Sequence, residues 1–359
     1  MRILYGVCGE GFGHSSRAIY MVHHLIERGH KVLIFSYGQA VDVLRREGFD
    51  VFEIRGVHLS FREGVLSVSR TLKNVLETLY ENIRNWKEMK SRVEGFGADV
   101  CISDMELVVP IISFIYRLPL ISLDNQHRLT HLDVRVPRRY RRDFFIARKA
   151  VKRVVSRADA FIILSFVRGA VVRDREKSFV VDPILRKEVL GSRKQLRRGD
   201  YVLVYLTKRD EGILRVLRQI DERFVVYVYG SRRRGRLGNM VFRDIGLGFL
   251  RDLVGCKGVI GSAGFTLISE ALYLGKPYFA LPLRGQFEQT LNALFLKQAG
   301  YGMFSEDLKR EEVEGFLNSL RKYEKRVVRR RIDSGEAARV LDRVLREISR
   351  KRSDDLKRK

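Results

Sequence analysis

Residues 257–302 limit the fold of this chain more than any other segment. They read as a buried strand ending at Ile260, a break of small residues G-S-A-G, a helix, and a second buried strand over 278–281. Apolar residues recur at helical spacing after the break, and Gly275 with Pro277 ends that helix before the next strand. Such a unit predicts an α/β fold with a parallel sheet.

The break at residues 261–264 suits a phosphate group. Its small residues let a ligand reach the main chain, and the free amide groups of a helix start attract anions. Glu270 lies too deep in the helix to cap it, which leaves its carboxylate available for hydroxyl groups such as those of a ribose. Glu288, Gln289 and Asn292 open the following helix with donors and acceptors suited to a sugar. Together these features predict a nucleotide-sugar site, although Glu270 or Gln289 taken singly also fits a solvated helix residue.

A second glycine-rich turn, C-G-E-G-F-G-H-S-S-R, follows the first strand. Gly11 and Gly13 permit a tight turn over a ligand, and His14 and Arg17 open the next helix. Dinucleotide-binding domains also carry such glycines, but the second strand, 31–36, ends in F-S-Y-G without their ribose-binding acid.

Polar residues also follow two later strands, which end at Asp104 and at the segment D-N-Q-H-R. Ligands of open parallel sheets bind beyond the carboxyl ends of the strands, so we expect His14, Asp104, Asp124 and His127 to face a shared opening. Each has a structural alternative, because the two aspartates suit helix caps and His127 suits a satisfied loop histidine.

The order of G-S-A-G, an acid on the next helix, Pro-Leu and E-Q-T-L-N-A resembles the donor half of GT-B glycosyltransferases. It is most similar to the MurG-like group, family 28, and to archaeal proteins of MurG type; the first glycine turn resembles the same group. The resemblance implies two Rossmann-like, doubly wound α/β domains facing a cleft. Expected domains are an acceptor-side domain at 1–185, a nucleotide-sugar domain at 198–323, and a helix with a basic tail at 324–359 that returns to the first domain. The tail, from Ser349 onward, reads as disordered.

The resemblance further implies an inverting, metal-independent transfer of a sugar from a nucleotide sugar, UDP-linked, to a hydroxyl, with no cofactor. His14 is the expected base, and Asp104 orients it or acts directly. Thr207 and Lys208 stand where MurG has a glycine-serine turn, a departure that leaves them as chemically suitable phosphate contacts. The donor contacts expected are Gly11, Gly13, Thr207, Lys208, Ile245, Ser262, Ala263, Gly264, Phe265, Glu270, Glu288 and Gln289, and the acceptor-side residues are Asp124 and His127.

The formal net charge of +26, from 69 Lys and Arg against 43 Asp and Glu, predicts an anionic partner. A helix within 135–157 would turn one apolar face to the core and one basic face to solvent. The apolar residues are Tyr140, Phe144, Ala147, Val151 and Val155, and the basic ones are Arg138, Arg141, Arg142, Lys149, Lys152 and Arg153. The basic helix, 138–157, is either a solvated surface or a patch that attracts anionic lipid. With the apolar segment 59–66, it predicts a lipid-linked acceptor and a cytoplasmic protein peripheral on the inner membrane face.

Other features narrow the functional class. No apolar run reaches the length of a membrane span, and the chain opens directly into a strand without a signal-peptide pattern. Cys8, Cys101 and Cys256 are scattered among strand residues, which predicts core thiols rather than a metal site. Two alternatives stay open: a GT-B-like nucleotide-sugar hydrolase or epimerase, and a basic nucleic-acid-binding protein, for which no recognition motif appears.

Overall fold

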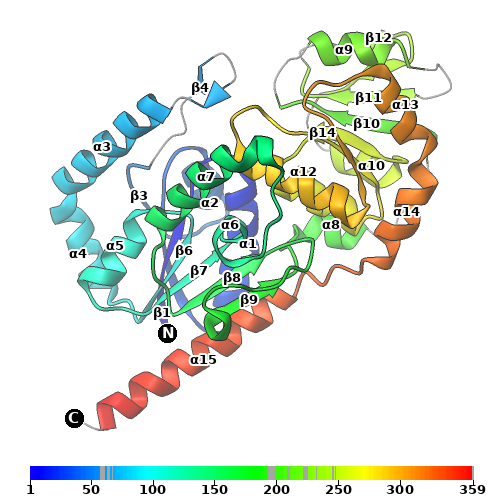
Figure 1. Cartoon of the computed structure of the whole chain (residues 1–359). Helices are drawn as coiled ribbons and strands as arrows, with labels where there is room; N and C mark the ends of the chain where they lie inside the picture. Colours follow the sequence, from blue (N-terminus) through cyan, green and yellow to red (C-terminus); the bar gives the residue numbers. More distant parts are fainter. Residues whose placement is uncertain are drawn as a thin grey trace. The chain divides into compact units, whose positions relative to one another are not determined.

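The structure, a computed structural model, describes residues 1–56, 61–62, 65–66, 68–192, 199–207, 211–220, 225–231, 233–244, 246 and 248–357. The chain divides into two compact units (Figure 1). The first unit holds Met1–Ile184 and Asp333–Lys359, and the second holds Leu185–Ile332. The C-terminal segment therefore belongs to the same unit as the N-terminus.

A parallel sheet forms the centre of the first unit, with the strand order β3-β2-β1-β6-β7-β8-β9. The strands are β1 (Arg2–Val7), β2 (Lys31–Ser36), β3 (Val51–Glu53), β6 (Val100–Asp104), β7 (Leu120–Asp124), β8 (Ala160–Leu164) and β9 (Ser178–Val181). Every residue of β6, β7 and β8 is buried, as expected of a parallel sheet covered on both faces. The strand order reverses between β1 and β6, so their carboxyl ends flank the place where doubly wound sheets bind ligands.

The helices of the first unit connect these strands. They are α1 (Phe12–Glu27), α2 (Gln39–Arg46), α3 (Val68–Arg84), α4 (Trp86–Phe96), α5 (Val108–Ile115), α6 (Arg128–His131), α7 (Arg141–Val154) and α15 (Glu336–Lys357), with 3-10 turns η1 (Arg138–Tyr140) and η2 (Arg175–Lys177). A small hairpin, β4 (Phe61–Arg62) with β5 (Val65–Leu66), stands outside the main sheet.

The second unit repeats this plan with the strand order β12-β13-β11-β10-β14-β15-β16, parallel except for β12. Its strands are β10 (Tyr201–Tyr205), β11 (Val225–Tyr229), β12 (Gly235–Leu237), β13 (Met240–Phe242), β14 (Val259–Ser262), β15 (Tyr278–Leu281) and β16 (Gly302–Phe304). Its helices are α8 (Lys187–Ser192), α9 (Glu211–Arg218), α10 (Gly248–Gly255), α11 (Phe265–Tyr273), α12 (Phe287–Ala299), α13 (Arg310–Asn318) and α14 (Leu320–Arg329). The predicted fold of two doubly wound α/β sheets is confirmed.

The last helix, α15, packs beside β8 and β9 of the first unit (Figure 1). Its apolar residues recur every three or four positions and are buried: Ala337, Ala338, Leu341, Val344, Leu345 and Ile348. Asp342 adds a polar link, because its carboxylate lies 2.9 Å from Nε2 of His24 on α1. The predicted return of the C-terminal helix to the first unit is confirmed, since this stripe can be buried only against another element.

The boundaries of two helices differ from what the apolar pattern predicts. The pattern over 68–93 favours one long helix, but the structure divides it into α3 and α4 at Asn85, a weak helix former. The long final helix is divided into α14 and α15, because the N–H of Asp333 donates to the buried carboxylate of Asp182 over 2.7 Å instead of continuing a helix.

The expectation of a disordered tail is also wrong, since α15 continues to Lys357. Arg352 donates to the backbone carbonyl of Asp99 over 2.5 Å and to its carboxylate over 3.1 Å. These contacts hold the last turns against the first unit despite their charged composition.

Candidate active site

A glycine turn after β1 presents His14 at the start of α1. Gly11 has a φ of 76°, in the left-handed region that favours glycine. Gly9 is required for a different reason, because a Cβ there would lie 2.0 Å from the carbonyl oxygen of Tyr37. Gly13 lies in the first turn of α1, directly before His14. The turn therefore determines where α1 begins and which residue stands at its opening.

His14, Arg17 and Asp104 form one buried cluster at the carboxyl end of β6. Nδ1 of His14 lies 2.9 Å from Oδ1 of Asp104. Arg17 donates from Nε to Oδ2 of Asp104 over 2.6 Å, and from Nη2 to Oδ1. The same Nη2 lies 2.7 Å from Nδ1 of His14. Directly after Asp104, Met105 has a φ of 52°, an unusual conformation for a residue other than glycine and one found often near functional sites.

Asp104 stays ionised in this interior position. Its side chain is fully buried, and burial by itself raises the pKa of a carboxyl group. The charge of Arg17, then that of His14 and the hydrogen bonds from both, outweigh burial and lower the pKa of Asp104 below its usual value. Burial lowers the pKa of Arg17, but the charge of Asp104 reverses this and raises that pKa above its usual value. Both members of the pair are therefore charged.

The segment after β7 brings Asn125 and Gln126 to this cluster. Arg17 donates from Nη1 to Oδ1 of Asn125 over 2.9 Å, and Nε2 of Gln126 lies 3.5 Å from Nε2 of His14. Neither residue was predicted from the sequence to belong to the site, and neither was the role of Arg17. Their only sequence signal is their position after a strand, which they share with Asp124 and His127.

Asp124 and His127 form a separate buried pair, each 1 % exposed, so the expectation that they face an opening is not met. His127 donates to Asp124 from its backbone N–H over 2.8 Å and lies 2.7 Å from it at Nδ1. The hydroxyl of Ser122 donates to the same carboxylate over 2.6 Å, and Nε2 of His127 faces the carbonyl of Val155 at 3.3 Å. The pair connects the end of β7 to the end of α7.

In the second unit, small residues lead from β14 into α11 as predicted. Gly264 caps the helix without a side chain, and a Cβ built there would meet nothing within 4 Å, so the space beside the helix start is open. Thr207 donates to the hydroxyl of Ser262 over 2.6 Å. Asn292, predicted as a sugar contact, is buried and instead donates to the carbonyl of Ala263 over 2.8 Å. Hydrogen bonds from Thr207 and Asn292 therefore hold Ser262 and Ala263 of the turn, and the helix begins directly after Gly264.

Glu270 lies on α11 but is not a solvated residue. Its side chain is buried, and Arg186 donates to its two oxygens, from Nε over 2.7 Å and from Nη2 over 2.9 Å. A carboxylate oxygen has two lone pairs, so each can accept a further hydrogen bond from a ligand hydroxyl. Glu270 is thus engaged in an ion pair rather than free, and its contact with the hydroxyl groups of a ribose stays a prediction.

Of the remaining predicted donor contacts, the structure describes two on α12 and does not describe two others. Gln289 is half-buried and accepts the N–H of Leu283 over 3.1 Å, which shapes the loop before α12. Glu288 stands in the first turn of α12. Lys208 and Ile245 lie outside the described residues.

The two units offer different chemistry. In the first, a slightly exposed imidazole bonded to a buried carboxylate is an arrangement suited to general base catalysis. In the second, a helix start next to open space favours an anion such as a diphosphate. In the described part of the chain, no group of three or more His, Cys, Asp or Glu side chains is placed to hold a metal ion. The three cysteines are buried thiols, as predicted.

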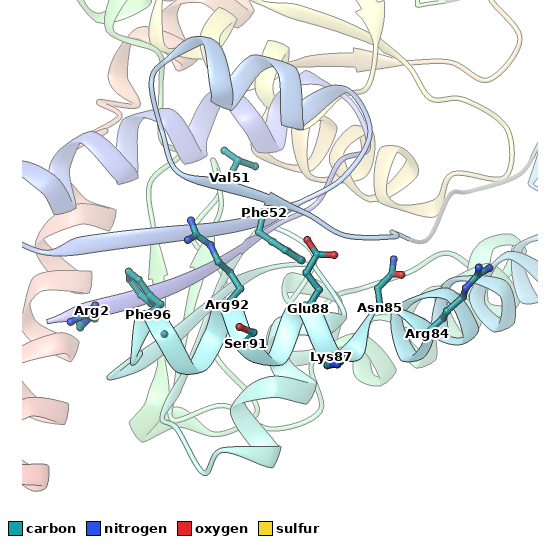
Figure 2. Close-up of a pocket in the computed structure, with 11 residues that line it drawn as sticks. Arg2, Val51, Phe52, Arg84, Asn85, Lys87, Glu88, Ser91, Arg92 and Phe96 are labelled. Atoms are coloured by element: carbon teal, nitrogen blue, oxygen red, sulfur yellow. The ribbon is translucent and has the colours of Figure 1, made fainter.

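A large cavity of the first unit lies at another place (Figure 2). Its volume is about 1080 Å³, and its lining comes from α4, the end of α3, the edge strand β3 and Arg2. Glu88 and Arg92 of α4 point toward Phe52 of β3 (Figure 2). Its described lining residues include none of the predicted catalytic, donor or acceptor residues, so volume alone would direct attention away from His14.

Solved structures of similar proteins identify the fold. The glycosyltransferase of kitacinnamycin is matched with a TM-score of 0.71 at 14% identity, over 96% of this chain and 98% of that one. The calicheamicin glycosyltransferase CalG4 is matched with a TM-score of 0.68 at 17% identity, over 98% and 99%. MurG of Acinetobacter baumannii is matched with a TM-score of 0.62 at 15% identity, over 96% and 99%. The fold is that of GT-B glycosyltransferases.

The sequence gives the family. The model of the family described as Glycosyl transferase family 1 matches residues 1–321, and the chain belongs to this family. Curated relatives include an uncharacterized glycosyltransferase of Methanosarcina acetivorans, 23% identical over 84% of this chain and 85% of that protein. Another, from Methanosarcina mazei, is 22% identical over 84% and 85%. The protein is a glycosyltransferase, which implies a nucleotide-sugar donor and an acceptor.

Proposed function

We propose that the protein is an inverting, metal-independent glycosyltransferase of MurG-like type that moves a sugar from a UDP-linked donor to a hydroxyl of a lipid-linked acceptor. The observation that carries the mechanism is the 2.9 Å contact between Nδ1 of His14 and the buried carboxylate of Asp104. The proposal uses the tautomer in which Nδ1 donates to Asp104 rather than accepting from Nη2 of Arg17, because Nε2 of His14 is then unprotonated and able to accept a proton.

The reaction follows from these roles. Nε2 of His14 takes the proton of the acceptor hydroxyl as its oxygen bonds to the anomeric carbon of the donor sugar. The bond from that carbon to the diphosphate oxygen breaks on the opposite face, which inverts the configuration. The leaving diphosphate carries the released electron pair, and the N–H groups at the start of α11 stabilise its charge.

A donor screen tests this proposal. Thermal shift of the pure protein against UDP, GDP, dTDP and CMP sugars is expected to show stabilisation by the UDP sugars. A structural neighbour, the spinosyn rhamnosyltransferase SpnG, was solved with thymidine diphosphate, so a response to dTDP sugars alone would move the proposal to that nucleotide. Release of free sugar without an acceptor would favour a hydrolase or epimerase. RNA binding that falls steeply with salt, without affinity for any nucleotide sugar, would favour a nucleic-acid-binding protein.

Glu270→Gln is expected to weaken nucleotide binding, because the ribose hydroxyls lose a charged acceptor, at a cost of about 1.5 to 3 kcal/mol. Glutamine keeps the size of the side chain, which matters because Glu270 is buried against Arg186. Titration calorimetry with UDP measures the change. Glu314→Gln, on the partly exposed side of α13, is the matched control. Equal affinity in the two variants would show that Glu270 serves only its ion pair with Arg186.

The basic helix supports an acceptor at a membrane surface. Tyr140, Val151 and Val155 are buried as predicted, and Phe144 and Ala147 are half-buried. The basic residues Arg138, Arg141, Arg142, Lys149 and Arg153 are exposed, and Lys152 is half-buried. Phe145 and Ile146 are 61 % and 44 % exposed on the same helix. Apolar side chains surrounded by cations suit the interface of an anionic bilayer.

A second exposed apolar face lies on α3. Leu76, Tyr80 and Ile83 are 63 %, 69 % and 72 % exposed, and their spacing places them on one side of the helix. Residues 59, 60, 63 and 64 of the predicted apolar segment 59–66 lie outside the described residues. In the described part of the chain, no helix is long and apolar enough to cross a membrane. We propose that the protein contacts the bilayer from one side through these helix faces.

Reversal of Arg141, Arg142, Lys149 and Lys152 to Glu is expected to abolish sedimentation with anionic vesicles. Several contacts of about 1 kcal/mol each are lost, and repulsion replaces them. UDP binding and activity on a short soluble acceptor analogue are expected to persist. The control reverses four exposed residues of α14, namely Arg321, Lys322, Lys325 and Arg329. Wild-type protein that ignores anionic vesicles at physiological salt, or a control variant that loses binding equally, would exclude α7 as the contact.

A further inference from the structure

Arg17 is a buried arginine at the centre of the candidate site, and it has no role in the proton transfer or in the binding of the leaving group. It is 5 % exposed and lies one turn after His14 on α1. Its guanidinium contacts Asp104 with two nitrogens, Asn125 with the third, and Nδ1 of His14 at 2.7 Å. Burial of an arginine is costly unless its charge is balanced, so its position needs a reason.

The reason lies in the charge beside the imidazole. A histidine bonded only to a buried carboxylate is favoured in its protonated form, and a protonated histidine cannot accept a proton from a hydroxyl. The charge of Arg17 cancels that of Asp104 at His14, and in the tautomer with the proton on Nδ1 the carboxylate still accepts the hydrogen bond from Nδ1. We propose that Arg17 is a positioning residue that neutralises Asp104, so that the carboxylate orients His14 without holding it in the charged form.

The geometry also limits the orientation of Asp104. Arg17 occupies both carboxylate oxygens side-on, and Asn125 holds the far nitrogen of the guanidinium at 2.9 Å. Asp104 therefore cannot rotate away from His14 without breaking two charged hydrogen bonds. Such bonds are stronger and more directional than neutral ones, which makes the arrangement rigid.

Other groups around the cluster are accounted for. Gln126, after β7, faces Nε2 of His14 and is neutral. Tyr5, on β1, is buried, and burial together with Asp104 raises its pKa, so its hydroxyl stays neutral. Asp124 acts on Arg17 through space but is bonded to His127 and Ser122. Among the described residues, Asp104 and Arg17 are thus the two charged groups that contact the imidazole.

A cycle of variants tests the proposal without any substrate. The pH at which the ring of His14 titrates is followed by NMR in the wild type and in Arg17→Gln, Asp104→Asn and the double variant. Arg17→Gln, which leaves Asp104 as an unbalanced negative charge, is expected to raise the titration midpoint of His14 by about 1 to 3 pH units. Asp104→Asn, which leaves the positive charge of Arg17, is expected to lower it. The double variant is expected to return near the wild type. Arg28→Gln, at the exposed end of α1, is the control.

The proposal is overturned if the Arg17→Gln midpoint equals the wild type, or if Arg17→Lys, which keeps the charge, shifts it as far as Arg17→Gln does. If Arg17→Gln fails to fold, the comparison of Asp104→Asn with the charge-balanced double variant decides. The titration midpoint of His14 is expected to be lower in Asp104→Asn than in the double variant, and equal midpoints would overturn the proposal.

The inference rests on the proposed role of His14 as base. In a transfer assay, Arg17→Gln is expected to lose turnover at neutral pH and to recover it as the pH rises, whereas a purely structural defect lowers turnover at every pH. If the His14 midpoints shift among the variants as expected but the protein transfers no sugar, the proposed function is disproved and the role of Arg17 stands.

Discussion

His14→Ala is expected to lower turnover by about 10² to 10⁴, the usual contribution of a general base. The donor affinity is expected to change little, because the imidazole acts on the acceptor hydroxyl in the transition state and the predicted diphosphate site lies on α11. His14 is only 9 % exposed, so the variant also loses packing around the ring, and its stability in urea has to be measured beside its turnover. Steady-state kinetics at saturating donor, with calorimetry for UDP, measures the two effects separately.

The matched control is His23→Ala. His23 lies on the same helix, its side chain is 34 % exposed, and it stands 3.5 Å from Glu47 on the surface. Turnover of this variant is expected to equal that of the wild type. If His14→Ala instead loses donor affinity and keeps its turnover at saturation, His14 is a phosphate ligand and the base has to be sought at Asp104.

Asp104→Ala is expected to lower the free energy of unfolding by about 3 to 5 kcal/mol, because it leaves the buried charge of Arg17 without its partner. The fluorescence of Trp86, the single tryptophan, reports unfolding of the first unit in urea. Asp50→Ala is the control, since Asp50 is half exposed and pairs with Arg92 on the surface, where an ion pair is worth about 1 kcal/mol or less. Similar losses in the two variants would contradict the account of a charged, buried pair.

The same pair predicts a pH dependence. The pKa of Asp104 is lower in the folded protein than in the unfolded chain, so its contribution is complete above the usual carboxyl range and is lost as the pH falls through the folded value. Urea midpoints of the wild type are therefore expected to decrease on acidification below about pH 4. The Asp104→Ala variant is expected to lack this part of the decrease.

Local patterns in the sequence were sufficient for much of the fold. Alternating runs of apolar strands and amphipathic helices with glycine breaks predicted a parallel α/β fold, and the resemblance to GT-B glycosyltransferases implied the two doubly wound domains and the return of the last helix. His14 and Gly264 were found for the same reason, since a residue at a strand end followed by a helix start has a known place in such a sheet. The tail from Ser349 was misjudged because its composition is charged, whereas Arg352 holds it through contacts with Asp99, far away in the sequence.

Pairing between distant side chains was decided only by the tertiary structure. Asp124 ends β7 and residues 125–127 follow it, and the path of the chain there turns Asn125 and Gln126 toward the site and buries Asp124 with His127. Arg186 and Glu270 are 84 residues apart, and Arg17 and Asp104 are 87 apart. The sequence by itself determined where each turn presents a polar residue, because backbone conformation responds to near neighbours. Which charges meet, and hence which carboxylate is balanced and which is open to a ligand, depends on the order of the strands and is a property of the folded chain.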